Sequence, residues 1–159
     1  MTDLIQTAKE ILLQESRASG TVWKDGIWTG GVWEKGTWQD GTWKGGTWQG
    51  GAWEYGTWEN GTWKGGMWKA GFWNGGNWEG GTWKKGMWKD GLWQSGTWKG
   101  GVWENGTWRT GTWENGTWKD GSWLGGTWKR GRILSKKTRK YVDSRVDPAT
   151  FYANEARRP

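Results

Sequence analysis

The chain has 159 residues, of which 31 are glycine and 22 are tryptophan, and its formal net charge is +7. Cysteine and histidine are both absent, which excludes disulfides, the usual zinc and copper ligand sets, and catalysis that needs an imidazole or a thiol. The length suits a single domain, which we expect to be elongated.

Residues 1–20 are predicted to form a helix. Thr2 or Asp3 can serve as its N-cap, and Gly20 can end it. Apolar residues fall on one face: Leu4, Ile5, Ala8, Ile11 and Leu12. Because the ends of a strand stack carry unpaired edges, we expect this helix to cover the first coil. Binding to a partner or to a membrane surface is the alternative, but the segment carries few cations.

Residues 21–131 repeat the five-residue unit Gly-x-Trp-x-x. Tryptophan occupies every fifth position from Trp23 to Trp128, and a glycine precedes each one by two residues from Gly26 onward. A helix would spread these indoles around its axis, and one continuous strand would expose every second indole. A short strand and a corner in each repeat avoid both outcomes. The pattern therefore predicts a β-solenoid whose stacked coils enclose the indoles.

Sorting the repeats into columns favours four repeats per coil, which makes a coil of about 20 residues, a length found in solenoids. The residues that follow tryptophan then form a lysine column of Lys24, Lys44, Lys64 and Lys84. Tryptophans four repeats apart would stack as the structural core: Trp23, Trp43, Trp63, Trp83, Trp103 and Trp123. Coils spaced by roughly 4.8 Å would make a rod about 25 Å long.

The same sorting predicts two outward surfaces. Val32, Phe72 and Leu92 would form an apolar stripe, which we take as a candidate partner contact; scattered tolerance of apolar residues is the alternative. The lysine column is a candidate phosphate contact, and an ordinary solvated face is the alternative.

The repeat resembles the pentapeptide-repeat family, whose unit places a small residue two positions before a central leucine or phenylalanine. Gly41 and Gly61 correspond to the small residue, and Trp43 and Trp63 to the central one. The resemblance covers residues 21–131 and implies a right-handed, square β-helix. This chain departs from the family by using glycine with tryptophan. The glycine-aromatic repeat also resembles arrays in predicted proteins of tailed bacteriophages, and this resemblance implies a virion component as one expectation.

Residues 132–159 are predicted to form a basic arm with a short helix. Asp147 and Pro148 form a typical helix start. Aromatic residues of this arm are candidate partner contacts: Tyr141, Phe151 and Tyr152. Basic residues are candidate phosphate contacts: Lys136, Lys137, Arg139 and Lys140. The arm has enough apolar residues to dock on its own last coil, on a neighbouring subunit or on a partner.

No catalytic motif appears, so we expect a protein that is not an enzyme and that uses no cofactor, metal or small-molecule substrate. We expect a structural or interaction protein, a rigid rod docked into a larger assembly through its terminal segments, with a protein partner or self-association. Nucleic-acid binding through the lysine column and the basic arm is one alternative. Recognition of a sugar or an ordered surface by a flat threonine face is another, through Thr37, Thr57, Thr97 and Thr117.

Neither a membrane-spanning run nor a secretion signal is recognisable, which favours a cytoplasmic or virion-associated protein without a membrane contact.

Overall fold

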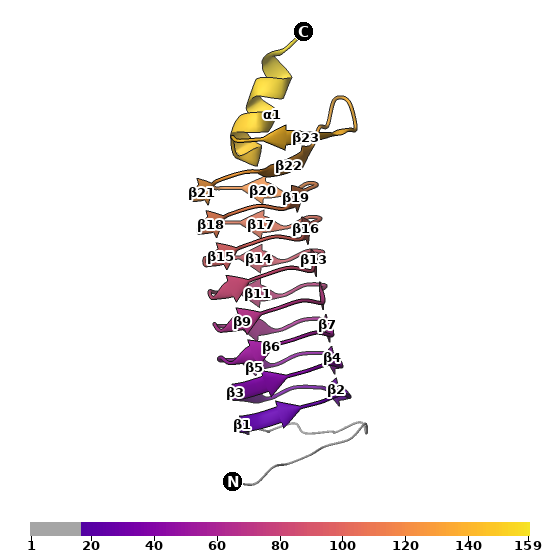
Figure 1. Cartoon of the computed structure of the whole chain (residues 1–159), viewed down its shortest axis with the longest axis vertical. Coiled ribbons are helices and arrows are strands. Elements are labelled where there is room, and N and C mark those ends of the chain that lie inside the picture. The colour runs from indigo at the N-terminus through magenta and orange to yellow at the C-terminus, as the bar shows by residue number, and fades with distance from the viewer. Residues whose placement is uncertain (1–16) are drawn as a thin grey trace.

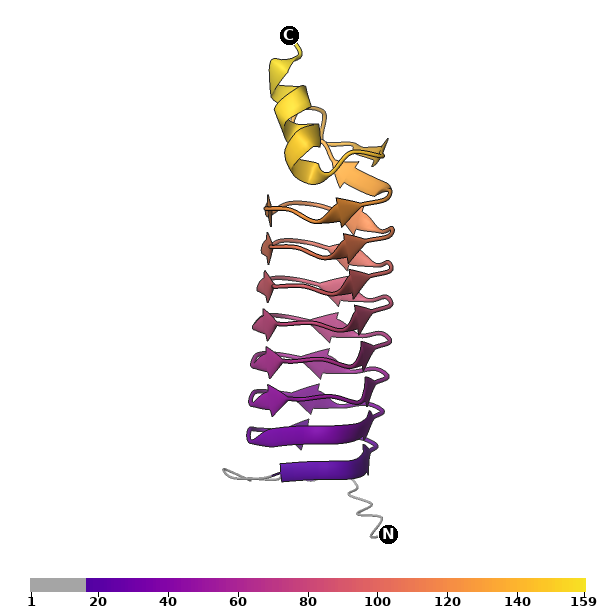
Figure 2. The ribbon, with the colours of Figure 1, turned by 90° about the vertical axis from the view of Figure 1, so that its left-hand side faces the viewer.

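The computed structural model describes residues 17–159, which form a straight parallel β-solenoid closed at its C-terminal end by a hairpin and a helix (Figures 1 and 2). The predicted solenoid and its enclosed tryptophans are confirmed. The predicted N-terminal helix lies almost entirely outside the described residues. Its last four residues, 17–20, belong instead to strand β1.

Three faces make up the shaft, and the strands of each face lie one above another. Face 1 contains β2 (Ile27–Trp28), β4 (Thr42–Trp43), β7 (Thr57–Trp58), β10 (Phe72–Trp73), β13 (Met87–Trp88), β16 (Val102–Trp103) and β19 (Thr117–Trp118). Face 2 contains the start of β3 (Val32–Trp38), then β5 (Thr47–Trp48), β8 (Thr62–Trp63), β11 (Asn77–Trp78), β14 (Leu92–Trp93), β17 (Thr107–Trp108) and β20 (Ser122–Trp123). Face 3 contains β1 (Arg17–Trp23), the end of β3, then β6 (Ala52–Trp53), β9 (Met67–Trp68), β12 (Thr82–Trp83), β15 (Thr97–Trp98), β18 (Thr112–Trp113) and β21 (Thr127–Trp128).

One coil contains three repeats, so the predicted square coil of four repeats is wrong. Trp43 pairs with Trp58, and Trp48 pairs with Trp63, in parallel register. The Thr62 N–H donates to the Gly46 carbonyl at 3.0 Å, and the same bond recurs from coil to coil along the shaft. Face 3 has eight strands, and a spacing of roughly 4.8 Å makes the shaft about 34 Å long.

The indoles explain why three repeats close a coil. Trp63 stacks on Trp48 with ring centroids 4.8 Å apart and planes 6° apart. It meets Trp58 and Trp68 edge to face, each at 5.9 Å and 75°. Three rings in this arrangement fill the cross-section, whereas four would leave a gap in the middle that a packed interior avoids.

Glycine forms the corner of each repeat. Gly61 has φ +122°, and a Cβ on it would lie 2.5 Å from the carbonyl oxygen of Gly46 in the coil below. At the same corner the Asn60 side chain accepts the Gly61 N–H at 2.8 Å. The corner therefore requires glycine both for its backbone angle and for the close approach of neighbouring coils.

The C-terminal arm continues the solenoid before it closes it. Strand β22 (Gly131–Leu134) pairs with β19, and its Ile133 occupies the position of a tryptophan directly after Trp118. Strand β23 (Tyr141–Ser144) returns antiparallel to β22. Helix α1 (Pro148–Arg157) follows, with the predicted Asp147 N-cap accepting the Thr150 N–H at 2.8 Å. The arm thus docks on its own last coil, which was one of the three alternatives.

Candidate functional site: the cationic cap

The predicted surface columns of the shaft do not form, because they assumed the wrong coil length. Lys24 and Lys84 lie on face 3, Lys44 on face 1 and Lys64 on face 2, so they make no common column. The predicted core tryptophans are all buried, but they are distributed over the three faces in the same way: Trp23, Trp43, Trp63, Trp83, Trp103 and Trp123.

The predicted apolar stripe is also divided between faces. Val32 and Leu92 lie on face 2, whereas Phe72 lies on face 1. In the true register Phe72 is followed on face 1 by Met87 and Val102. The ring of Tyr55 lies 6.4 Å from that of Phe72. This short apolar row becomes visible in the sequence only when three repeats are assigned to each coil.

The predicted threonine face is wrong for the same reason, since Thr37 and Thr97 lie on face 3 and Thr57 and Thr117 on face 1. Face 3 has a different threonine row: Thr82, Thr97, Thr112 and Thr127. This row is one residue wide, and charged residues follow it in every coil.

Opposite charges on neighbouring coils are the feature of the sequence that could have indicated the correct number of repeats per coil. Lys69 pairs with Glu54 at 3.0 Å, and Lys119 pairs with Glu104 at 3.2 Å, in each case three repeats apart. The arrangement with four repeats per coil stacked lysines on one another, which is unfavourable.

The net charge of the chain is concentrated in its last 31 residues. Residues 1–128 contain 13 basic and 13 acidic residues, whereas residues 129–159 contain 10 basic and three acidic residues. The difference of +7 in this last segment equals the net charge of the whole chain. We call residues 129–159 the cationic cap. It includes the predicted basic residues of the loop between β22 and β23: Lys136, Lys137, Arg139 and Lys140.

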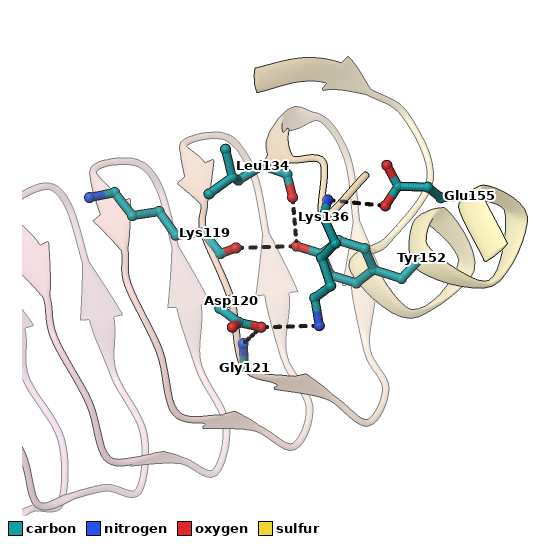
Figure 3. A network of polar contacts seen from close by, with 7 residues as sticks. All are labelled: Lys119, Asp120, Gly121, Leu134, Lys136, Tyr152 and Glu155. Atoms are coloured by element: carbon teal, nitrogen blue, oxygen red, sulfur yellow. Dashed lines mark hydrogen bonds and ion pairs between the residues drawn. The ribbon is translucent and has the colours of Figure 1, made fainter. Parts of the chain in front are cut away.

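A half-buried tyrosine, Tyr152, ties helix α1 to the last coil (Figure 3). The Tyr152 hydroxyl lies 3.2 Å from the Lys119 carbonyl oxygen and 3.0 Å from that of Leu134, so it can donate its proton to either. Burial, together with the negative charges of Asp120 and Glu155, raises the pKa of Tyr152 to about 12. Lys136 lies over the same ring with Nζ 4.5 Å from its centroid. Of the predicted aromatic contacts, Tyr152 and Phe151 are thus half-buried against the core, and only Tyr141 is largely exposed.

Two carboxylates hold the loop of the cap in place. Asp120 accepts the Gly121 N–H at 2.8 Å and pairs with Lys136 at 3.2 Å. The Gly121 N–H is the main cause that lowers the pKa of Asp120, and Lys136 adds to it. Glu155 accepts from the Ser135 hydroxyl and from the Lys136 N–H, contacts that lower its pKa. The loop is therefore ordered by the shaft on one side and by α1 on the other.

Two grooves border the cap. One, of about 770 Å³, lies beside face 1 and is lined by three arginines: Arg130 just before β22, Arg132 within β22 and Arg145 just after β23. The other, of about 420 Å³, lies between β23 and α1 and contains Val142, Val146 and Phe151. Neither Arg130 nor Arg145 forms an ion pair within residues 17–159. These arginines were not among the candidate contacts, because only the fold brings the three together.

Among residues 17–159, no group of three acidic, cysteine or histidine side chains is arranged to hold a metal ion. Within the same range, no helix is long and apolar enough to cross a membrane. Comparison with protein-family models, with curated proteins and with solved structures finds no match to this chain.

Proposed function

We propose that this protein is a non-enzymatic structural protein, a rigid rod that attaches to a larger assembly through its cationic cap. The observation that carries the proposal is the charge distribution: residues 1–128 are neutral overall, and the net charge of +7 lies in residues 129–159. A concentrated positive charge favours a negatively charged partner and speeds their encounter.

The shaft supports the role of a spacer. Every coil repeats the same backbone hydrogen bonds and the same indole contacts, so its stiffness comes from a continuous core rather than from a specialised segment. The resemblance of the repeat to arrays of tailed bacteriophages makes a virion the first assembly to test.

Nucleic acid is the second candidate partner. Arg130, Arg132 and Arg145 line one groove beside the basic loop, and guanidinium groups suit phosphate. Binding to nucleic acid should weaken steeply as salt is raised.

A binding experiment with two polyanions tests both candidates. Polyglutamate stands for an acidic protein and a single-stranded oligonucleotide for nucleic acid, each titrated at several salt concentrations. The cap variant carries Arg139→Gln, Lys140→Gln and Arg145→Gln. The matched shaft variant loses the same charge through Lys44→Gln, Lys64→Gln and Lys84→Gln.

We expect the cap variant to bind polyglutamate about tenfold more weakly, since three modest charge contacts together amount to about one order of magnitude. The shaft variant should bind like the unchanged protein. Equal losses in both variants, or no binding of either probe, would overturn attachment through the cap. A preference for the oligonucleotide with a steep salt dependence would establish the second candidate instead.

A further inference from the structure

Strand β23 closes the solenoid and is itself an edge. It is the last strand in the order of the face 1 sheet, and it pairs with β22 on one side only. An unpaired edge carries backbone donors and acceptors that can pair with a further strand. In Figure 1 this edge faces away from the shaft, beside α1.

The direction of the backbone groups on β23 follows from its neighbours. The Arg132 N–H donates to the Gly116 carbonyl, on the side of β22 that faces the shaft. The Ser135 N–H donates to the Lys140 carbonyl, on the side that faces β23. Along a strand, the backbone N–H and C=O groups of successive residues point alternately toward one neighbouring strand and toward the other. The backbone groups of Ile133 therefore point toward Val142, its partner on β23, and the backbone groups of Val142 point back toward β22. It follows that the N–H and C=O groups of Tyr141 and Asp143 point outward from the edge.

The groove beside this edge suits an apolar side chain. Val142 shares the inward side of the hairpin with Ile133, its partner in register, but it lies beyond the tryptophan stack and is 39% exposed. Val146 is 42% exposed, and Phe151 of α1 forms the opposite side of the groove. A strand added to β23 would place every second side chain over these residues, as each coil of the shaft places its tryptophan.

The rim of the groove is cationic and therefore favours acidic residues in a bound segment. Lys137, Arg145 and Arg158 line it. Its acidic members are Asp143 and Glu155, and Glu155 is already bound to Ser135 and to the loop backbone. A second copy of this chain would bring another cap of +7 against the first, so like charges oppose end-to-end pairing of two copies.

We propose that the outer edge of β23 binds an extended segment of an acidic partner protein as an additional β-strand. Alternate apolar side chains of this segment enter the groove between β23 and α1, and acidic side chains lie along its cationic rim. Backbone pairing supplies affinity, and the groove and its charge supply specificity. This inference rests on the proposed attachment through the cap and names its site and its binding mode.

Amide hydrogen exchange followed by NMR tests the mode directly. The probes are two synthetic peptides of equal length, one alternating valine with glutamate and one alternating valine with lysine. In the free protein the Tyr141 and Asp143 amides should exchange fast and the Val142 amide slowly. Saturation with the glutamate peptide should slow exchange at Tyr141 and Asp143 at least about tenfold, as for amides that gain a hydrogen bond. The lysine peptide should not bind.

A pair of variants separates the backbone contribution from the charge. Asp143→Pro removes an outward N–H that β22 does not use, a position where an edge strand accepts proline. Asp143→Ala removes the same carboxylate and keeps the N–H. We expect Asp143→Pro to abolish binding of the glutamate peptide and Asp143→Ala to retain it. An unchanged chemical-shift pattern of the tryptophan indoles shows that the fold is intact. If Asp143→Pro lowers stability, a glutamate peptide with alternate N-methyl groups provides the same test on the unchanged protein.

The outcomes distinguish this inference from the function on which it rests. Peptide binding without protection of Tyr141 and Asp143, or equal binding by the proline and alanine variants, overturns strand addition and leaves attachment through the cap standing. Binding of the oligonucleotide alone overturns both the acidic protein partner and strand addition. Self-association without peptide, with slowed exchange of the Tyr141 and Asp143 amides, would show that the edge pairs with a second copy and would overturn the acidic partner.

Discussion

At the scale of single residues, glycine forms the corners of the repeat and tryptophan forms its core. Trp63 is fully buried and contacts indoles above, below and on both sides. Eighteen of the indole N–H groups described are buried without a hydrogen-bond partner, so stacking and exclusion of water must outweigh this cost. Trp83 and Trp108 donate to carbonyls of the coil above, each at 3.1 Å.

Two glycines of one repeat should respond differently to alanine. Gly61→Ala places a Cβ 2.5 Å from a backbone oxygen at φ +122° and should destabilise the rod by about 3 kcal/mol or more. Gly65→Ala is the control, because its Cβ would lie 3.9 Å from the nearest oxygen. We expect it to change stability by less than about 1 kcal/mol. Urea unfolding followed by tryptophan fluorescence measures both, and equal midpoints for the two variants would contradict the close approach of coils at Gly61.

At the scale of elements, the hairpin and α1 protect the open end of the stack. Ile133 covers the end of face 1, and α1 contacts β20 at the end of face 2. The Trp128 indole donates to the Ser144 carbonyl at 3.1 Å, which ties the end of face 3 to β23. Removal of the whole arm would therefore expose the core as well as remove the proposed binding site, and point substitutions are the better test of function.

Acid should release the cap before it unfolds the shaft. Asp120 and Glu155 have pKa values lowered in the folded state. Groups of this kind contribute stability above their unfolded pKa, roughly pH 4, and lose it as pH falls through the folded value. We expect faster amide exchange in α1 below about pH 4, while the amides of central coils stay protected. Asp120→Asn with Glu155→Gln should remove most of this pH dependence; an unaltered acid response would show that other groups hold the cap.

At the scale of the whole molecule, register determines which side chains become neighbours. With three repeats per coil, Glu54 lies below Lys69, and Phe72 lies below Met87. With four repeats per coil, each of these side chains would have a different neighbour in the next coil. The net positive charge, the arginine-lined groove, the groove between β23 and α1, and the outer edge of β23 all lie at the cap. This concentration of features at the cap is the basis for the proposed attachment through it.

Engineered cysteines measure the coil length directly, since the natural chain has none. Thr47 and Thr62 are partners in register on face 2. Neighbouring strands are roughly 4.8 Å apart, within the Cα separation that a disulfide spans. Thr47→Cys with Thr62→Cys should therefore oxidise to a disulfide, as measured by loss of free thiols. Thr42→Cys with Thr62→Cys, four repeats apart and on different faces, should stay reduced, and the reverse result would restore the square coil.

The sequence by itself determined that the chain is a solenoid, that its tryptophans are inside and that α1 begins at Pro148 after Asp147. These features depend on local periodicity and on helix capping, which neighbouring residues decide. Only the tertiary structure decided that three repeats make a coil, because coil closure depends on how indoles from successive repeats fill one cross-section. The same holds for the cap: Ile133 continues the five-residue spacing from Trp128, but the pairing of β22 with β19 showed that the stack extends there. Lysines and threonines sorted as single residue types did not reveal the register; among the outward residues, the pairing of Lys69 with Glu54 across 15 positions is the feature that agrees with three repeats per coil.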